Sequence, residues 1–411
     1  MQHPEPHLRK NRRPAPTCGE IVQMSDTEKE PQRAIIVGAS AAGLFAAYRL
    51  ARGGLPVRVY EAQAPFRPAP RTLIVTPAWL RLLDFDAGEA VLNRTHTFEL
   101  ISRSASVRIP LREPDVVIDR ARFLQLLVQK AKEAGGEVLF GHRLTQMHQD
   151  GVPLILRFAV GANRERVVPA LHALGADGVR STVAHAARKD GLERVGLSQA
   201  RVPLPPDLAP DTVRVWFDRA ATRFFYWLIP ESHETGVLGL IAETPAQARG
   251  LLERFLRARG WEPLAWQEES PVPLFPLRFS PPAVGDGRLL LAGDAAGQVK
   301  DTTVGGVVAG MRGAAAAARS LLRHTPYEAE LRSLRRELNF HALVRRVLDG
   351  FTDEDYDRLL RLLNRRGLDV LSRRHRDELA RAVWCLLPAQ PRWLLLGARA
   401  LVRGFRGTGS R

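Results

Sequence analysis

Cysteine is almost absent from this chain of 411 residues. Its two cysteines, Cys18 and Cys385, lie far apart, and neither belongs to a Cys-x-x-Cys pair. Such pairs are the usual sign of a zinc site or of dithiol redox chemistry, so we predict no metal site. A chain with so few cysteines suits a reducing compartment, and we expect the protein in the cytoplasm.

Lysine is also scarce, occurring at only six positions (10, 29, 130, 132, 189 and 300), so arginine supplies nearly all of the positive charge. The formal net charge of +16 would otherwise indicate a nucleic-acid partner. Such an arginine bias is typical of genome composition, so we predict no nucleic-acid partner. The 45% of apolar residues is an ordinary globular composition, and the length allows two or three packed units.

Long apolar runs are missing as well, since none reaches the roughly 20 residues that a membrane-spanning helix requires. The first 32 residues are polar and proline-rich and lack the apolar core of a signal peptide. We predict a disordered extension over residues 1–32, and we expect Met24 to be the natural start, just ahead of the first strand.

The stretch RAIIVGASAAGLFAAYRLARGGLPVRVYEA predicts a strand over 34–37, a helix over 41–52 and a strand over 57–60. The turn before the helix has the first and last glycines of a Gly-x-Gly-x-x-Gly fingerprint, with serine in the middle. These glycines permit the tight turn and close helix packing, and the helix N-terminus attracts a pyrophosphate. Glu61, the acidic residue at the end of the second strand, is placed to accept hydrogen bonds from a ribose diol. The predicted dinucleotide-binding residues are Gly38, Ser40, Ala41, Ala42, Gly43 and Glu61.

Three later segments add to this unit. LLLAGDAAGQVKDTTVGGVVAGM (289–311) is an apolar run that ends in Gly-Asp and continues through small residues into a predicted helix. ALGADGVRSTV (173–183) indicates a strand followed by Asp-Gly, and VIDRARFLQLLVQKAKEAG (117–135) indicates a strand followed by an amphipathic helix.

These four segments resemble the glutathione-reductase-type FAD fold shared by aromatic hydroxylases and geranylgeranyl reductases. The resemblance implies an α/β fold with a Rossmann-like FAD-binding domain, an inserted antiparallel-sheet substrate domain and a C-terminal helical region. It implies that Asp294 ends a central strand and binds the ribitol of FAD, and that backbone N–H groups approach the flavin ring, which requires small side chains. The further implied cofactor-binding residues are Arg71, Arg120, Asp177, Gly178, Gly293, Asp294, Gly297, Gly305 and Gly306.

The resemblance also suggests how the chain is divided. We assign residues 33–94, 119–185 and 285–325 to the FAD-binding domain, and residues 95–118 and 186–284 to the substrate domain. TVRVWFDRAATRFFYWLIPESHETGVLGLIAET, within the latter range, has the apolar alternation and turns of antiparallel strands. Residues 326–411 are rich in arginine and leucine and predict a helical region. Its helices could contact a membrane surface or could simply cap the FAD-binding domain.

The details of the Gly-Asp loop favour one branch of the superfamily. GDAAGQVK followed by TT and GG is similar to the geranylgeranyl reductase pattern GDAAGQVKPTTGGG, whereas aromatic hydroxylases usually have histidine where this chain has Gly297. Asp301 replaces the proline of the reductase pattern, and Val304 replaces its first glycine. We therefore expect the shape and charge of this loop to differ from the pattern.

A cavity element is indicated by FFYWLIP (224–230), which resembles the aromatic-x-Trp-x-(Phe/Ile)-Pro element of geranylgeranyl reductases and flavin halogenases. The resemblance implies that Tyr226 and Trp227 line the cavity over the flavin; the alternative is a strand packing on its sheet. Halogenases need a lysine after the first dinucleotide unit, and RPAPRTLIVTPAWLRLLDF has none. Halogenation is therefore the less favoured activity.

The resemblance implies a flavoprotein oxidoreductase. We expect it to reduce C=C bonds of an isoprenoid or another apolar or lipid substrate, with NAD(P)H or a ferredoxin-like protein as a transient reductant. The alternatives are an FAD-dependent monooxygenase acting on an aromatic or polyketide-like substrate, and a flavin-binding protein of the membrane surface without turnover. We expect a cytoplasmic protein that can lie at the inner face of the membrane. No residue stands out as a general acid.

Overall fold

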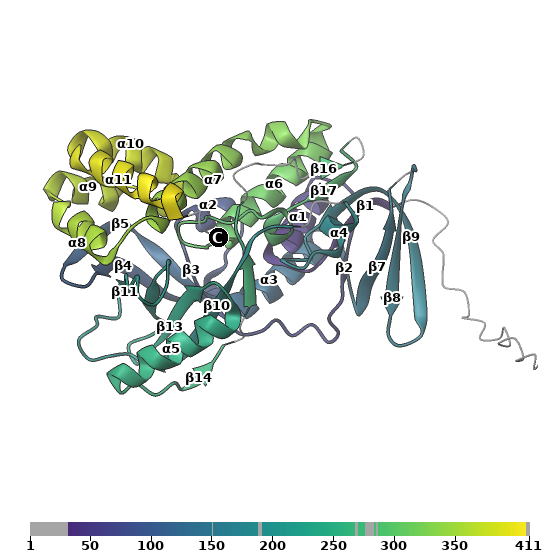
Figure 1. The fold of residues 1–411 in the computed structure, drawn as a ribbon. Helices are drawn as coiled ribbons and strands as arrows, with labels where there is room; N and C mark the ends of the chain where they lie inside the picture. The colour runs from purple at the N-terminus through teal and green to yellow at the C-terminus, as the bar shows by residue number, and fades with distance from the viewer. Residues whose placement is uncertain are drawn as a thin grey trace, which may run out of the picture.

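The computed structural model of the chain describes residues 32–149, 151–187, 191–267, 270–275, 283–284 and 287–407. Two β-sheets, the helices that pack on them and a group of C-terminal helices make up this part of the chain (Figure 1). The predicted α/β fold with a second, antiparallel-rich sheet and C-terminal helices is confirmed. The predicted disordered extension lies outside the described residues, except for Gln32, which begins the first strand.

The first sheet has eight strands among the described residues, in the order β16-β17-β9-β1-β2-β6, with β8 paired to β9 and β7 to β8. They are β1 (Gln32–Val37), β2 (Val57–Glu61), β6 (Glu137–Phe140), β7 (His142–His148), β8 (Leu154–Val160), β9 (Arg164–Gly175), β16 (Ala283–Val284) and β17 (Leu289–Leu291). β1 is parallel to β2 and β9, and β9 is parallel to β17. Parallel strands end at the same edge of a sheet, so the residues that follow β1, β9 and β17 meet there.

The position of β17 corrects one expectation. The strand before Asp294 is next to the edge strand rather than central, because among the described residues only the short hairpin strand β16 pairs beyond it. The strand-helix-strand unit, by contrast, is confirmed by β1, α1 (Ala41–Arg52) and β2.

Helices cover one face of the first sheet. α1 packs against α3 (Arg120–Glu133) and α6 (Val307–Arg323), and their apolar faces share one core with the sheet. α6 is rich in buried alanine and glycine, which lets it lie close to its neighbours. α4 (Thr182–Ala186) contributes to the core on the other face, together with β8 and β9. Short turns of helix are α2 (Ala78–Leu82), η1 (Gly88–Ala90) and η2 (Gly293–Ala296).

The second sheet has nine strands among the described residues, in the order β14-β10-β13-β12-β11-β4-β5-β3, with β15 also paired to β10. They are β3 (Thr72–Val75), β4 (Val91–Ile101), β5 (Ser106–Asp119), β10 (Arg194–Pro203), β11 (Thr212–Trp216), β12 (Tyr226–Pro230), β13 (Thr235–Ala242), β14 (Ala265–Trp266) and β15 (Ser270–Pro273). These strands pair antiparallel, except that β4 is parallel to β11. α5 (Pro245–Arg259) packs against β10 and β13. β3 lies in the range 33–94, which the sequence assigned to the FAD-binding domain; the domain boundaries stay a prediction.

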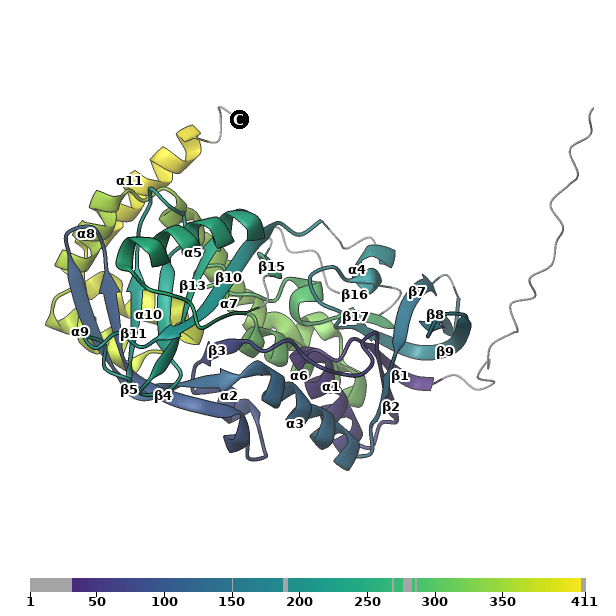
Figure 2. The same ribbon diagram turned by 90° about the horizontal axis from the view of Figure 1, so that it is seen from below.

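The C-terminal region is helical: α7 (Tyr327–Asp349), α8 (Asp353–Leu362), α9 (Arg365–Arg373), η3 (Arg376–Glu378), α10 (Leu379–Ala389) and α11 (Arg392–Gly407). α8 and α9 contact β5, and α7 packs on α6, so this region joins both sheets (Figure 2). Within the described ranges, no helix combines the length and the apolar character that crossing a membrane requires.

Candidate functional site

The carboxyl edge of the first sheet brings the sequence motifs together. Val37 and Leu291 both pair with Gly175, so the chain leaves β1, β9 and β17 at one level. Gly38 leaves β1 with φ +100° and donates its N–H to Tyr60 O at 2.8 Å. A Cβ atom on Gly38 would lie 2.6 Å from Ala176 O. Glycine is therefore required here both for the backbone angle and for the contact with the loop after β9.

The turn into α1 supplies a cradle of backbone groups. Ser40, at the middle position of the fingerprint, is the N-cap of α1, and its Oγ accepts the N–H of Gly43 at 3.2 Å. A Cβ on Gly43 would come within 2.1 Å of Gly38 O, so the last glycine permits the tight turn. Serine can replace the middle glycine because its side chain caps the helix. The N-terminus of α1 points at the site, where its free N–H groups could bind an anion.

Glu61 ends β2 and faces the same turn. Its carboxylate accepts the N–H of Ala39 at 2.7 Å and of Gln63 at 2.8 Å. These bonds hold the carboxylate beside the glycine-rich turn. Its predicted interaction with a ribose diol stays a prediction.

The Gly-Asp loop explains the small residues that follow it. Gly293 has φ +66°, and Asp294 lies in the turn η2 at the cavity wall. Gly306 and Gly310, at the start of α6, face this loop. A Cβ atom on Gly306 would lie 3.0 Å from Asp294 Oδ1, and a Cβ atom on Gly310 would lie 3.0 Å from Gly293 Cα. α6 can therefore approach the loop only because these positions have no side chain.

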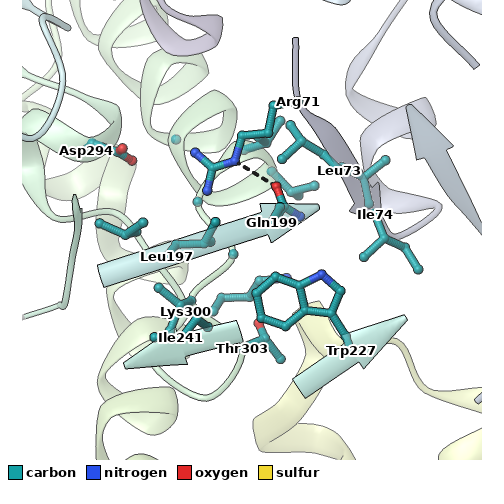
Figure 3. A pocket seen from close by; sticks show the side chains of 18 of the residues that line it. Arg71, Leu73, Ile74, Leu197, Gln199, Trp227, Ile241, Asp294, Lys300 and Thr303 are labelled. Atoms are coloured by element: carbon teal, nitrogen blue, oxygen red, sulfur yellow. Dashed lines mark hydrogen bonds between the residues drawn. The ribbon is translucent and has the colours of Figure 1, made fainter. Parts of the chain in front are cut away.

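Two arginines lie near the Asp294 carboxylate. Burial raises the pKa of Asp294, and the charges of Arg71 and Arg120 oppose that rise. Arg71 Nε donates to Gln199 Oε1 at 3.3 Å, and Arg71 O accepts the N–H of Arg120 at 3.0 Å (Figure 3). The site therefore combines a buried carboxylate with two cations from separate segments.

The Asp-Gly element after β9 has a structural role, and its contact with the cofactor stays a prediction. The carboxylate of Asp177 accepts hydrogen bonds from Ser181 Oγ at 2.5 Å and from Thr182 N at 2.7 Å. Burial raises the pKa of Asp177, and the bonds at the start of α4 counteract this. Asp177 and Gly178 line the cavity.

A cavity of about 690 Å³ connects these residues to the second sheet. Figure 3 shows it between Asp294 and Arg71 on one side and Trp227 on the other. The wall on the second sheet is mainly apolar and includes Leu73, Ile74, Leu100, Leu197, Val215 and Ile241. The cofactor-binding residues of the prediction that line the cavity are Ser40, Ala41, Ala42, Arg71, Arg120, Asp177, Gly178, Gly293, Asp294, Gly305 and Gly306.

The prediction that Tyr226 lines the cavity is wrong, whereas Trp227 does line it. Neighbouring residues of a strand point to opposite faces of the sheet. Tyr226 stacks on Phe255 of α5, with ring centroids 4.3 Å apart, on the face away from the cavity. Trp227 lies across Gly239 of β13, where a Cβ would come within 2.2 Å of the indole.

Some predicted residues lie beside the cavity rather than in its wall. Gly38, Gly43, Glu61 and Gly297 are not among its lining residues. Gly297 ends η2 with φ +63°. At the two departures from the reductase pattern, Val304 has the left-handed φ of +51°, and buried Asp301 accepts the N–H of Phe275 at 2.7 Å. The expected difference of this loop from the pattern stays a prediction. Burial raises the pKa of Asp301 to about 7, against the opposing effect of that hydrogen bond.

The C-terminal region contributes wall residues that the sequence did not indicate. Lys300 Nζ lies 2.5 Å from Asp377 Oδ1, and Asp377 also accepts a hydrogen bond from Thr76. Burial disfavours the charged form of Asp377, but Lys300 and Thr76 outweigh it and hold the pKa of this carboxyl below its usual range. Arg345 and Arg376 line the same part of the cavity. Lys300 belongs to the Gly-Asp loop motif, but its partner Asp377 lies 77 residues away in the sequence and belongs to no motif.

The residues present fit a bound FAD. The cradle at Gly38 admits no Cβ, the N-terminus of α1 is suited to a pyrophosphate, and the small-residue loop around Gly293 leaves backbone accessible to a planar ring. The polar groups of the cavity wall also suit FAD, since Asp294, Arg71 and Arg120 share the wall with apolar side chains.

Comparisons with known proteins agree with this geometry. The model of the family described as FAD binding domain matches residues 32–239. The geranylgeranyl diphosphate reductase of Rhodobacter capsulatus is 27% identical over 338 residues, which cover 79% of this chain and 84% of that protein. Digeranylgeranylglycerophospholipid reductase 2 of Methanothermobacter thermautotrophicus is 28% identical over 375 residues, which cover 82% and 93%.

A solved structure shows the same fold. The geranylgeranyl bacteriochlorophyll reductase-like protein of Thermoplasma acidophilum superimposes with a TM-score of 0.69 at 16% identity, over 89% of this chain and 98% of that one. The family match covers half of the chain and contains the glycine-rich turn, the Asp-Gly element and Trp227. The chain therefore belongs to the FAD binding domain family, and it is an FAD-dependent oxidoreductase similar to geranylgeranyl reductases.

Proposed function

We propose that the protein reduces C=C bonds of an isoprenoid or another apolar substrate, using electrons from NAD(P)H or a ferredoxin-like protein. The observation that carries this proposal is the single cavity that joins the motif residues of the first sheet to the apolar wall of the second. The names of the two curated relatives, both reductases of geranylgeranyl compounds, support the same substrate class.

We assign the two ends of the cofactor to separate residue groups. The adenosine and pyrophosphate would be held by Gly38, Ser40, Ala41, Ala42, Gly43 and Glu61, and the flavin half by Arg71, Arg120, Asp177, Gly178, Gly293, Asp294, Gly297, Gly305 and Gly306. When bound and reduced by the electron donor, FAD would supply a hydride to one carbon of the double bond, and a proton would join the neighbouring carbon. The residues of the chain bind the substrate, orient it and exclude water.

The side chains of the second sheet position the substrate and exclude water. Leu197, Ile241 and Trp227 come from three adjacent strands, and their alternate residues face one cavity. An apolar chain lying against them would lose its hydration and be held beside the small-residue loop of the first sheet. Gly297, at the position of the hydroxylase histidine, favours the reductase over the monooxygenase alternative.

We also propose that α10 and α11 lie at the inner face of the membrane, where a lipid substrate would be met. Residues 379–411 contain six arginines and no acidic residue. Trp384 on α10 is 71% exposed, and Leu395 on α11 is 64% exposed, beside exposed Arg392 and Arg399. Exposed apolar side chains next to exposed arginines suit an anionic lipid surface. Sedimentation with anionic vesicles should decrease in Leu394→Ser/Leu395→Ser, and equal sedimentation would contradict the contact.

The decisive experiment is an anaerobic titration of the purified flavoprotein with NADPH, NADH or a reduced ferredoxin. Once reduced, the protein is mixed with an isoprenoid lipid without oxygen, or with air without lipid. Reoxidation by the lipid, with the saturated product found by mass spectrometry, is the expected result. Reoxidation by oxygen alone, with an oxygenated product from an aromatic substrate, would replace the reductase by the monooxygenase. Trp227→Leu serves as the matched variant, because it changes the cavity wall without touching the first sheet.

A further inference from the structure

Aromatic side chains line the cavity in series from Trp227 toward the C-terminal region. The ring centroids of Trp227 and Phe225 lie 5.8 Å apart, and those of Phe225 and Phe217 lie 6.3 Å apart, each pair edge to face. All three residues belong to the cavity wall, and Phe217 and Phe225 are only half-buried. Phe225 precedes β12 and Phe217 follows β11, so the series leads to the end of the sheet where Trp216 pairs with Tyr226.

Phe217 is the residue at which this series meets the C-terminal region. Its ring stacks on that of Tyr356 in α8, with centroids 4.4 Å apart and planes 8° apart. Tyr356 is 1% exposed and packs in turn on buried Phe351, with centroids 5.2 Å apart. These two residues share a buried apolar core with Leu396 and Ala400 of α11. Packed side chains, rather than open cavity, therefore lie behind Phe217.

The backbone around Phe217 is fixed to the same helices. Phe217 N donates to Ile101 O at 2.9 Å. Two residues later, Arg219 N donates to Asp353 Oδ1 at 2.8 Å, and Arg219 Nη2 donates to Asp349 O at 3.0 Å. These bonds tie the turn after β11 to the end of α7 and the start of α8. The Phe217 ring is thus held both by its backbone and by the stacked ring behind it, and it cannot move aside without disturbing a packed core.

We propose that Phe217, positioned by Tyr356, is an end stop of the cavity and limits the length of the apolar chain that the cavity admits. Each methylene added to a bound chain gains contact with the wall until the chain reaches Phe217, and a longer chain must displace the ring or leave the cavity. Arg345 of α7 and Arg376 of η3 line the cavity from the helical side, so the stop concerns the part of the chain that lies along the second sheet.

This inference rests on the proposed function for the identity of the chain, whose double bond would lie beside the small-residue loop of the first sheet. The limit on length does not depend on that identity. It gives the C-terminal region a part in substrate choice, because α8 supplies the ring that holds Phe217 in place.

The test measures the binding of alcohols of increasing length to the holoprotein, followed by the change in flavin absorbance. One series is geraniol, farnesol, geranylgeraniol and geranylfarnesol, and the other is decanol, dodecanol, tetradecanol, hexadecanol and octadecanol. In both series the affinity should rise with length up to a limit and then stop rising. Affinity that still rises at the longest member of both series would overturn the inference.

Phe217→Ala should move the limit to a longer alcohol, because it removes the ring from the wall. Affinity for the first alcohol beyond the limit should rise by about tenfold or more, whereas affinity for shorter alcohols should change by less than about threefold. Trp216→Ala is the matched control, since Trp216 lies outside the cavity wall and packs on Phe255 of α5, with centroids 5.1 Å apart. A limit set by the solubility of the alcohols would not move in either variant, and an unmoved limit in folded Phe217→Ala would contradict the stop.

Tyr356→Leu tests the part assigned to the C-terminal region. It leaves Phe217 in place but removes the ring stacked on it, so the first alcohol beyond the limit should gain about threefold in affinity. Phe351→Leu changes a ring one step further from the cavity and should leave the limit unchanged. An unchanged limit in folded Tyr356→Leu would overturn the positioning role of α8. If Phe217→Ala does not fold, Phe217→Leu takes its place with a smaller expected shift.

The saturated alcohols separate this inference from the proposed function, because they have no double bond to reduce. If the limit moves in Phe217→Ala but geranylgeraniol is not reduced, the stop stands and the isoprenoid reductase fails. If geranylgeraniol is reduced but the limit does not move, the reductase stands and the stop fails.

Discussion

The two sides of the cavity are built in different ways. On the first sheet, the wall is made of backbone and small residues, and a Cβ atom at Gly38 or Gly306 would meet its neighbours at 2.6 Å and 3.0 Å. On the second sheet, the wall is made of large side chains from neighbouring strands, such as Leu197 and Trp227. One side is therefore determined by where side chains are missing, and the other by which side chains are present.

This difference has a consequence for substitutions. The first side should tolerate almost no added atom, because backbone cannot move aside easily. The second should tolerate changes of size and respond with altered substrate preference, because side chains can repack. Substitutions on each side of the cavity therefore test that contrast.

The largest effect is expected for Gly38→Ala. The new Cβ would clash with backbone, and φ +100° is strained for any residue with a side chain. We expect a loss of unfolding free energy above about 3 kcal/mol together with loss of flavin. Gly135→Ala is the matched control, with φ +95° but no atom within 4 Å, and should cost about 1 kcal/mol while retaining flavin. Chemical unfolding and the flavin content of the purified proteins measure both, and equal losses would show that space around Gly38 is unimportant.

Asp294→Ala should weaken FAD binding by about 2 to 3 kcal/mol, roughly 30- to 150-fold. The variant removes a buried carboxylate that lies near the charges of Arg71 and Arg120. Fluorescence titration of the apoprotein with FAD gives the affinity. Asp294→Asn keeps a hydrogen-bonding side chain and should lose less. If alanine binds FAD as tightly as the unchanged protein, the carboxylate has no part in holding the cofactor.

How far the sequence could predict this site follows from the same contrast. Positions where no side chain fits can be recognised in the sequence. They appear as glycines at a fixed spacing, such as Gly38 and Gly43, or as a Gly-Asp pair such as Gly293-Asp294. Such signals are local, so the strand-helix-strand unit and the loop after β17 could both be predicted. The strand order could not, because the place of β17 in the sheet is set by its long-range pairing with β9, in which Leu289 lies opposite Ala173.

The sequence indicates the side-chain wall of the second sheet less clearly. Tyr226 and Trp227 are adjacent and both aromatic, and only the register of β12 in its sheet decides which of them faces the cavity. Lys300 and Asp377 lie 77 residues apart in the sequence, and the scarcity of lysine in this chain does not indicate which carboxylate Lys300 pairs with. Charge pairing across such distances depends on how α7 to α10 fold back, which local patterns do not specify.

Asp301 lies in the loop where the two sides meet, and it makes the stability of the protein depend on pH. Its folded pKa, raised from 3.8 to about 7, means that the folded chain keeps a proton which the unfolded chain has released. Stability should therefore fall as pH rises from about 4 to 7 and stay level above that. Asp301→Asn should be more stable than the unchanged protein at pH 8 by about 2 to 4 kcal/mol, and equal to it near pH 4.

The control for Asp301 is Asp357→Asn, which should behave in the opposite way. Hydrogen bonds from Ser102 and Ser104 lower the pKa of Asp357 to about 2, so its contribution is present at neutral pH and disappears as pH falls below about 4. Urea unfolding at several pH values measures both variants. A difference for Asp301→Asn that does not change between pH 4 and 8 would contradict the assigned titration.

Trp227→Leu and Tyr226→Leu compare the two faces of one strand. Trp227 lines the cavity, so its variant should raise the KM for the substrate by about tenfold while leaving flavin content unchanged. Tyr226 stacks on Phe255 away from the cavity, so its variant should lower thermal stability and leave KM unchanged. Steady-state kinetics and thermal unfolding distinguish them. The same change of KM in both would mean that β12 transmits repacking from one face to the other.

The smallest effect concerns Val304, the residue in the place of the first glycine of the reductase pattern. A β-branched side chain at φ +51° is strained, and glycine relieves that strain, whereas alanine does not. Val304→Gly should therefore be more stable than Val304→Ala by about 1 kcal/mol. Val308 is also buried but lies in the helix α6, where the order should reverse and alanine should exceed glycine by about 1 kcal/mol. Both pairs are measured by urea unfolding of the holoprotein. If alanine is the more stable residue at both positions, the loop relaxes to accept a side chain, and the backbone-built side of the cavity is less rigid than its close contacts indicate.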